Sequence, residues 1–423
     1  MINIAIYLGG RTGTLVNAVN INNGNPGIGG TQFCMLELAY YLHDTGKYNV
    51  SIIAGREYLV KEGINFLMTN KDRDVCNLVE LLNTDIFILS QFNNKALEAK
   101  IAELRCKVVI WSHNYIFSDF CNFITNTSQI VCNVFVGKQL YDRYIDDDVI
   151  KKSTYIYNMY TDKFPHIERE NDHKTVVYMG AIIPGKGFLE LCSIWTKILN
   201  KVPDARLLVL GSGKLYGDAL LGKLGIATQK YENAFAKYIT DSKGQLIPSI
   251  KFLGIIGDEK YEIFRKASVG IVNPSGRTET FGMGILEMAE AKLPVVTIGK
   301  NGYFDTVQSG RSGILSKNLK SMVNDVVKLL TDHEMNIKMG EEAKNNNQHF
   351  LPSVIGPQWD QLLSNIYINT HAPKLSILKP TPPYSNNFKW IRVCISKIRF
   401  KLGFKYFPSL IRIESCLVRL MHR

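Results

Sequence analysis

Two glutamates in the second half of the chain, Glu279 and Glu287, stand at the two ends of a short glycine-containing turn. The segment reads E-T-F-G-M-G-I-L-E and lies between an apolar run at 269–272 and a helical pattern that ends near Lys292. The exposed amides and the dipole of a helix start favour an anion, and carboxylates accept hydrogen bonds from sugar hydroxyls. This combination suits a phosphate that is joined to a sugar, as in a nucleotide-sugar.

Alternating strand-like and helix-like segments fill the first half of the chain. A helix is predicted from Gly29-Gly30-Thr31 to about His43, and residues 161–174 have the polar composition of a linker. Short apolar runs separated by helical patterns indicate βαβ units and a parallel sheet. The predicted strands of this half are residues 3–8, 48–54, 85–89, 107–111 and 129–134.

The alternation of strand-like and helix-like segments starts again after the linker. Helices are predicted at 185–200 and 319–330, and a polar, Asn-rich patch surrounds Asn345. The predicted strands are residues 175–179, 206–210, 249–253, 269–272 and 294–298. The fold expected is α/β, with two Rossmann-like doubly wound domains whose cleft faces the carboxyl ends of the strands.

This pattern divides the chain into four parts. We expect an N-terminal domain for the acceptor at 1–160, a linker at 161–174, a C-terminal nucleotide-sugar domain at 175–370 and a tail at 371–423. Whether the last helices of the C-terminal domain pack back on the first domain is left open.

The cysteines and the N-terminal residues indicate the cellular compartment of the protein. Eight cysteines are scattered without a C-x-x-C pair, which argues against a zinc site or a disulfide framework and for a reducing compartment. The first ten residues have the pattern of a strand followed by a glycine turn, without the charged region of a signal peptide. A cytoplasmic protein is expected.

The positive charge is concentrated in the tail. Residues 374–423 contain eleven Lys and Arg but one acid, so this segment carries +10 of the net charge of +12. Bulky apolar and aromatic residues are interleaved with these charges between Phe388 and Phe407, and no apolar stretch approaches the roughly 20 residues that span a bilayer. We expect a surface-lying helix on anionic lipid at the inner face of the membrane, in preference to a nucleic-acid site or a solvated tail.

Further motifs join the two glutamates. Residues 178–187 read Y-M-G-A-I-I-P-G-K-G, the run at 111–114 reads W-S-H-N, and L-P-V-V follows the second glutamate at 293–296. Together with Phe281-Gly282 and Gly29-Gly30-Thr31, these segments resemble the group 1 glycosyltransferases of family 4, which are retaining enzymes with the GT-B fold. The resemblance covers about residues 1–370 and leaves the tail outside.

The resemblance implies a role for each matching residue. Glu287 would accept the ribose hydroxyls and Glu279 the hydroxyls of the donor sugar, while Lys186 would neutralise the leaving diphosphate and His113 would orient the sugar or stabilise its positive character. The family's donor diphosphate also contacts backbone around two glycine-containing segments, which correspond here to Phe281, Gly282 and Met283 and to Gly29, Gly30 and Thr31. No metal and no cofactor are expected, since such enzymes bind the donor without one.

One position departs from the family pattern. The family has an arginine directly after the glycine of the first loop, and here that position is Ala181. Lys186 therefore lacks its usual cationic partner. Either another basic residue serves, for which Arg277 is a candidate, or the phosphate is held differently.

Structural explanations compete with each of these roles. Glu279 and Glu287 could be a solvated pair at a helix start, Lys186 a turn lysine, His113 a core histidine and Gly29-Gly30 a tight turn. Asp146-Asp147-Asp148 contains a D-x-D pattern, the metal and nucleotide motif of the other large glycosyltransferase fold. Because it does not follow a buried strand, we interpret it as a polar helix end.

The function favoured by the sequence is transfer of a sugar from a nucleotide-sugar, expected to be a UDP-sugar, with retention of configuration. The acceptor would be a glycan or a lipid-linked molecule in surface polysaccharide synthesis. Alternatives are a GT-B nucleotide-sugar epimerase or phosphorylase, and a non-catalytic nucleotide-sugar-binding subunit.

Overall fold

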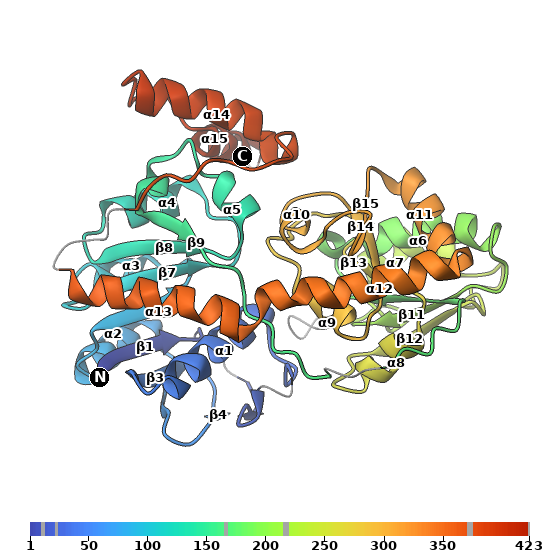
Figure 1. Cartoon of the computed structure of the whole chain (residues 1–423), viewed down its shortest axis with the longest axis horizontal. Coiled ribbons are helices and arrows are strands. Elements are labelled where there is room, and N and C mark those ends of the chain that lie inside the picture. Colours follow the sequence, from blue (N-terminus) through green and yellow to red (C-terminus); the bar gives the residue numbers. More distant parts are fainter. Residues whose placement is uncertain (10–12, 22–23, 165–167, 215–219, 370–374, 422–423) are drawn as a thin grey trace. The chain divides into compact units, whose positions relative to one another are not determined.

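In the computed structural model, the chain divides into two compact units (Figure 1). Unit 1 contains residues 1–161 and 350–423, and unit 2 contains residues 162–349. The structure describes residues 1–9, 13–21, 24–164, 168–214, 220–369 and 375–421, so parts of the predicted linker and of the start of the tail lie outside it.

Unit 1 is built on a parallel sheet with strand order β5-β3-β1-β6-β7-β8-β9. The five strands predicted in this half all form, within two residues of the expected ends. The strands are β1 (Ile2–Tyr7), β3 (Tyr48–Ala54), β5 (Asn65–Met68), β6 (Ile86–Ser90), β7 (Lys107–Ser112), β8 (Ile130–Phe135) and β9 (Ser153–Tyr155). A small separate pair joins β2 (Val16–Asn17) to β4 (Tyr58–Leu59).

Helices pack around this sheet. The predicted helix that opens at Gly30 forms, and the late helix α13 packs against it, so the last helix before the tail belongs to unit 1. The helices are α1 (Gly30–Asp44), α2 (Asp72–Leu81), α3 (Lys95–Ile101), α4 (Ser118–Asn126), α5 (Lys138–Asp142), the 3-10 turn η2 (Asp148–Lys152) and α13 (Pro352–Ile368).

Unit 2 repeats the doubly wound plan with strand order β12-β11-β10-β13-β14-β15, all parallel. The strands are β10 (Thr175–Met179), β11 (Arg206–Leu210), β12 (Ile250–Gly254), β13 (Val269–Val272), β14 (Val295–Ile298) and β15 (Gly313–Ser316). The helices are η3 (Pro184–Lys186), α6 (Phe188–Leu199), α7 (Gln229–Ile239), α8 (Lys260–Lys266), α9 (Met283–Glu290), α10 (Tyr303–Thr306), α11 (Leu319–Thr331) and α12 (His333–Asn347).

Several elements differ from the sequence expectation. The edge strands β5 and β15 were not predicted, because a four-residue strand that is partly exposed lacks a continuous apolar run. The Asn-rich patch near Asn345 is the end of α12, a helix that buries Asn336 and Asn347 with amide hydrogen bonds to backbone carbonyls.

The tail that the sequence set apart is packed onto unit 1. Its ordered elements are the 3-10 turn η5 (Asn386–Phe388), α14 (Lys389–Ser396), the π-helical turn η6 (Lys397–Lys401) and α15 (Leu410–Met421). Figure 1 shows α14 and α15 beside α4 and α5 of the same unit. Within the described part of the chain, no helix combines the length and the apolar character that crossing a membrane requires.

Buried ion pairs explain this packing, since the tail is basic and the surface that receives it is acidic. Lys389 lies 3.0 Å from Asp142, and both side chains are fully buried. Arg392 contacts Asp146 at 3.4 Å, and Arg399 pairs with Asp148. We call Asp142, Asp146, Asp147 and Asp148 the acidic dock.

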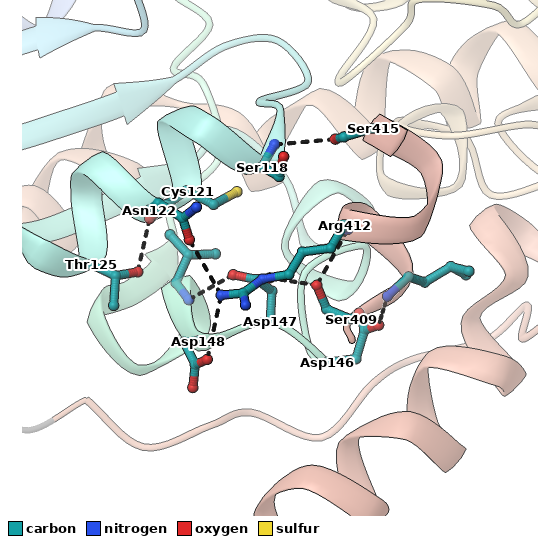
Figure 2. Close-up of polar contacts among 12 residues, drawn as sticks. Ser118, Cys121, Asn122, Thr125, Asp146, Asp147, Asp148, Ser409, Arg412 and Ser415 are labelled. Carbon is teal, nitrogen blue, oxygen red and sulfur yellow. Dashed lines mark hydrogen bonds and ion pairs between the residues drawn. The ribbon is translucent and has the colours of Figure 1, made fainter. Parts of the chain in front are cut away.

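The middle of the acidic dock also holds backbone and hydroxyl groups at the start of α15. The Leu410 amide donates to Asp146 at 2.6 Å, and the Ser409 hydroxyl donates to Asp147 (Figure 2). Arg412 reaches Asp147 at 3.6 Å. The D-x-D pattern is therefore a buried anchor for the tail, where the sequence indicated a polar helix end.

Candidate functional site

The strand order of unit 2 fixes where a ligand site is expected. β10 and β13 are neighbours at the centre of the sheet, while the chain leaves β10 toward β11 on one side and β13 toward β14 on the other. Such a reversal of strand order opens a crevice at the carboxyl ends of the two strands. The loops that follow β10 and β13 carry Lys186 and Glu279.

These two residues are in direct contact although 93 positions separate them. The Lys186 Nζ lies 3.0 Å from the Glu279 Oε2, and the side chains are only 21% and 14% exposed. Asn273, buried at the end of β13, donates to the same oxygen at 3.3 Å and to the Arg277 carbonyl at 2.6 Å. The site thus has a cation and a carboxylate held side by side.

Two glycines allow the loops to approach each other. Gly187 has φ +71, and a Cβ there would lie 2.5 Å from the Ser275 amide nitrogen of the opposite loop. Gly282 has φ +96 at the start of α9, and a Cβ there would lie 2.9 Å from the Tyr303 ring. Both positions require glycine because an L side chain would be strained and would clash.

The loop before Glu279 holds a strained residue. Thr278 has φ +62, in the left-handed region that β-branched residues rarely adopt. Such a conformation costs on the order of 1–3 kcal/mol and persists only where the surroundings impose it. The Thr278 hydroxyl donates to the Gly185 carbonyl at 3.2 Å, which ties this loop to the one that carries Lys186.

The N-terminus of α9 completes this part of the site. Among the residues that the structure describes, no side chain caps this helix end, where Gly282 and Met283 begin the first turn. Backbone amides at a helix start attract an anion. The four predicted residues of this region, Glu279, Phe281, Gly282 and Met283, therefore lie at a place suited to a diphosphate.

Glu287 has a partner that the sequence analysis missed. The Lys260 Nζ at the start of α8 lies 2.9 Å from the Glu287 Oε2, and the two side chains are 9% and 16% exposed. A buried cation that bonds to a carboxylate oxygen fixes the orientation of the carboxylate. No sequence motif marks Lys260. It reaches Glu287 only because α8, which begins with Lys260, packs near α9, which carries Glu287.

The other end of α9 is attached to the beginning of unit 2. Glu290 is buried and accepts hydrogen bonds from the Lys163 and Phe164 amides at 3.0 and 2.7 Å. Burial, reinforced by a hydrogen bond with Asp162, raises the pKa of Glu290 to about 7. The helix that starts at the candidate site therefore ends on a carboxyl that titrates near neutral pH.

We expect Glu290→Gln to flatten the pH dependence of stability. Because the folded-state pKa is raised, the contribution of the Glu290 carboxyl to the stability of the wild type is greatest below its ordinary pKa of about 4.5. This contribution is lost as the pH rises through about 7. Glutamine imitates the protonated acid and cannot ionise. Urea unfolding of both proteins at pH 5, 6, 7 and 8 checks this, and parallel curves would contradict it.

His113 and its neighbours belong to unit 1. His113 follows β7 directly, is buried, and its amide donates to Gln91 at 2.9 Å, just after the adjacent strand β6. Its ring lies 4.5 Å from that of Trp111, centroid to centroid. Burial lowers the pKa of His113 to about 3, so this imidazole is neutral at physiological pH.

Gly29, Gly30 and Thr31 form the start of α1 in the same unit. Gln32 donates to the Leu8 carbonyl at 3.1 Å, which holds this helix end near the carboxyl end of β1. Gly29 has φ −61, and Gly30 has no described atom within 4 Å of where a Cβ would lie. A tight turn therefore does not require these glycines, whereas an open approach to the backbone is compatible with them.

Ala181 occupies the position of the family arginine, and Arg277 is the candidate to replace that arginine's charge. Ala181 is buried, and the Tyr178 hydroxyl donates to its carbonyl at 3.3 Å and to that of Lys186 at 2.8 Å. Arg277 lies on the loop that leads to Glu279, is 58% exposed and pairs with Glu190 of α6. Such an exposed ion pair contributes only ~0–1 kcal/mol, so little holds the guanidinium in this position.

The arrangement in unit 2 combines a lysine, a helix N-terminus and two carboxylates within one loop–helix segment. The cation and amides suit phosphate oxygens, and the carboxylates suit hydroxyl groups. Across the residues described, no group of three or more His, Cys, Asp or Glu is arranged to hold a metal ion.

Comparison with known families agrees with this geometry. Residues 173–332 match the model of the glycosyl transferases group 1, a stretch that contains Lys186, Glu279 and Glu287. The chain is 25% identical over 196 residues to the capsular polysaccharide biosynthesis glycosyltransferase CapM of Staphylococcus aureus, and this match spans 46% of each chain. It is 22% identical over 357 residues to the putative glycosyltransferase YtcC of Bacillus subtilis, covering 78% of this chain and 84% of the relative.

Solved structures show the fold. A glycosyltransferase from Rickettsia africae superposes with a TM-score of 0.64 at 14% identity, over 87% of this chain and 99% of the other. Anabaena HepE, solved in complex with UDP and glucose, superposes with a TM-score of 0.63 at 16% identity, over 86% of this chain and all of the other. The chain thus has the GT-B fold, and its residues 173–332 are similar to the group 1 glycosyltransferases.

Proposed function

We propose that the protein transfers a sugar from a nucleotide-sugar to a glycan or a lipid-linked acceptor, with retention of configuration. The donor we propose is a UDP-sugar, and the process is surface polysaccharide synthesis. Support comes from CapM, named for capsular polysaccharide biosynthesis, and from HepE, whose structure contains UDP and glucose. The observation that carries the proposal is the contact of Lys186 with Glu279 beside the N-terminus of α9.

Each polar group has a task in this proposal. Glu287, oriented by Lys260, accepts the ribose hydroxyls, and the first amides of α9 bind the diphosphate. When the donor binds, Lys186 exchanges its contact with Glu279 for a phosphate oxygen, and Glu279 becomes available to the hydroxyls of the sugar. Lys186 then stabilises the charge that builds on the leaving diphosphate, which is the kind of interaction that lowers a barrier most.

The residues of unit 1 complete the proposal. The neutral imidazole of His113 can hydrogen-bond a sugar hydroxyl without repelling the positive character that develops on the sugar. The open backbone at Gly29, Gly30 and Thr31 approaches the phosphates. Retention follows if the acceptor attacks from the face of the leaving diphosphate, one of whose oxygens takes the acceptor's proton.

A screen of nucleotide-sugars tests the proposal. A donor that binds only the folded protein raises its melting temperature, and UDP release that depends on an added glycan or lipid-linked acceptor identifies transfer. An epimerase would convert the donor without acceptor, and a phosphorylase would produce a sugar phosphate. A donor that binds but is not consumed with any acceptor would favour a non-catalytic subunit.

Arg277 is the proposed replacement for the family arginine. We expect Arg277→Ala to raise the donor KM about fivefold, because a partly exposed charge-assisted contact contributes roughly 1 kcal/mol. Glu190→Ala is the matched control, since it removes the same ion pair and leaves the cation. Initial rates at varied donor concentration measure both, and an equal loss in the two variants would make the ion pair structural.

We also propose that the protein is cytoplasmic and lies on the inner face of the membrane. The eight cysteines are free, as a reducing compartment favours. The basic, aromatic tail supports the membrane contact, and nucleic acid is not proposed as a partner. A lipid-linked acceptor would be presented at that surface.

A further inference from the structure

The docked tail turns two kinds of residues in opposite directions. Three of its basic side chains point inward and are buried on the acidic dock: Lys389, Arg392 and Arg399. Ile395 and Ile411 are buried, but many of its large apolar side chains remain outside, among them Phe388, Trp390, Leu402, Phe404, Tyr406 and Phe407. The three buried charges differ from the pattern of an ordinary surface helix, which exposes its charges and buries its apolar face.

The outward residues are concentrated in one turn. Residues 401–408, which read K-L-G-F-K-Y-F-P, are exposed at every position and connect η6 to α15. We call this segment the aromatic turn. Phe404 is 62% exposed and Tyr406 is fully exposed, which is costly in water for two large rings on one short segment.

Both ends of the aromatic turn are fixed to the acidic dock. Before the turn, Arg399 pairs with Asp148 and donates to the Phe407 carbonyl at 2.8 Å. After it, Ser409 and Leu410 donate to Asp147 and Asp146. Inside the turn, the Phe404 amide donates to the Ile398 carbonyl at 3.2 Å. The backbone that carries the exposed rings is therefore held in place by an ion pair and hydrogen bonds.

The charge around these rings is positive. Lys401 and Lys405 lie within the turn and Lys397 one helical turn earlier, all three exposed. No acid occurs between Lys374 and Ile413 in the sequence, and Glu414 is engaged by Arg143 and Arg392. A partner surface that complements this one carries negative charges where it meets water and apolar groups just beneath them.

We propose that the aromatic turn is a preformed insertion site for an anionic lipid bilayer. Phe404 and Tyr406 enter the interface between headgroups and acyl chains, and Lys401 and Lys405 contact the anionic headgroups. Arg392 and Arg399, whose guanidinium groups would favour the planar contacts of a nucleic acid, are buried inside the protein. The site deepens the proposed membrane association and is independent of the transfer reaction.

This site differs from the surface-lying helix that the sequence predicted. There, every Lys and Arg of the tail would share in lipid binding. Here, only the outward lysines do, and the buried Arg399 serves by holding the turn in place. Binding should therefore respond to Phe404, Tyr406, Lys401 and Lys405.

Co-sedimentation of the full-length protein with sucrose-loaded vesicles tests the site. We compare phosphatidylcholine vesicles with vesicles that contain phosphatidylglycerol, and we expect the wild type to bind the anionic ones. Phe404→Ser/Tyr406→Ser should lower this binding at least tenfold because two rings lose apolar burial. Lys401→Gln/Lys405→Gln should lower it about 25-fold on the anionic vesicles alone, at roughly fivefold for each lysine.

The matched control is Met68→Ser/Leu81→Ser. These residues are equally exposed and apolar, but they lie on β5 and α2 of unit 1, with β5 at the sheet edge opposite β9. The control should bind vesicles as the wild type does. All variants should keep the wild-type melting temperature and the wild-type thermal shift with the donor.

Two outcomes would overturn the site. One is an aromatic variant that binds anionic vesicles as tightly as the wild type. The other is a wild type that remains in solution with both kinds of vesicle, which would make the turn a contact for another protein. Donor binding, measured in parallel, separates these failures from a failure of the proposed transferase function.

Discussion

Lys186→Met is expected to lower turnover by about 10²–10³-fold while the protein stays folded and still binds the donor. The Lys186 ammonium, 3.0 Å from Glu279 and half-buried, is the cation that we assign to the leaving diphosphate. Removing one such preorganised group from a site costs about 2.7–4 kcal/mol of transition-state stabilisation. Donor consumption at saturating donor, measured with and without acceptor, gives the change in kcat.

A second lysine–glutamate pair of the same site provides the control. Lys260→Met removes a cation that contacts Glu287 at 2.9 Å, so the charge change and the substitution are the same. Because Lys260 positions the carboxylate proposed for the ribose, we expect the donor KM to rise about tenfold and kcat to change little. Lys260→Arg should restore much of the lost affinity if charge at this place is what matters.

The contrast between the two variants is the informative result. If both raised KM equally and left kcat intact, Lys186 would be a binding residue without a role in the chemical step. If neither changed any kinetic constant, the assignment of the donor site to the loops after β10 and β13 would be wrong.

Arg392→Met is expected to destabilise unit 1 by about 3–5 kcal/mol. Its guanidinium is buried, 3.4 Å from Asp146 and 2.6 Å from Glu414. Burial already raises the pKa of Asp146, and the loss of the cation leaves that carboxylate buried without compensation. Breaking a buried ion pair from one side is far more costly than removing both partners. Urea unfolding followed by circular dichroism measures the loss.

Lys397→Met is the matched control within the same tail. It removes one positive charge from the exposed residue that begins η6. Its effect on stability should stay within about 0.5 kcal/mol, as for most surface substitutions. Equal effects of the two substitutions would show that the tail is a solvated appendage. Removing the whole tail would not test lipid binding alone, since truncation would also expose the acidic dock.

Much of the fold can be predicted from local sequence. Strands buried on both faces are rich in apolar residues, so stretches such as 48–54 and 206–210 mark β3 and β11 at their observed ends. The segment from Glu279 to Glu287 is equally local, because a strand, a glycine turn and a helix start follow one another. Edge strands β5 and β15 carry a weaker apolar signal, and the sequence missed both.

By itself, then, the sequence determined the two doubly wound units and the residue types of the candidate site, because apolar runs and glycine turns act over a few neighbouring positions. Only the tertiary structure decided the partners of those residues. Lys260 reaches Glu287 across 27 positions, and Arg392 reaches Asp146 across 246. Ion pairs at such separations leave no periodic pattern in the sequence, since charge alone does not select among the many residues of opposite sign. The direction in which the basic tail turns its arginines and its aromatic rings therefore depends on the packing of the whole unit.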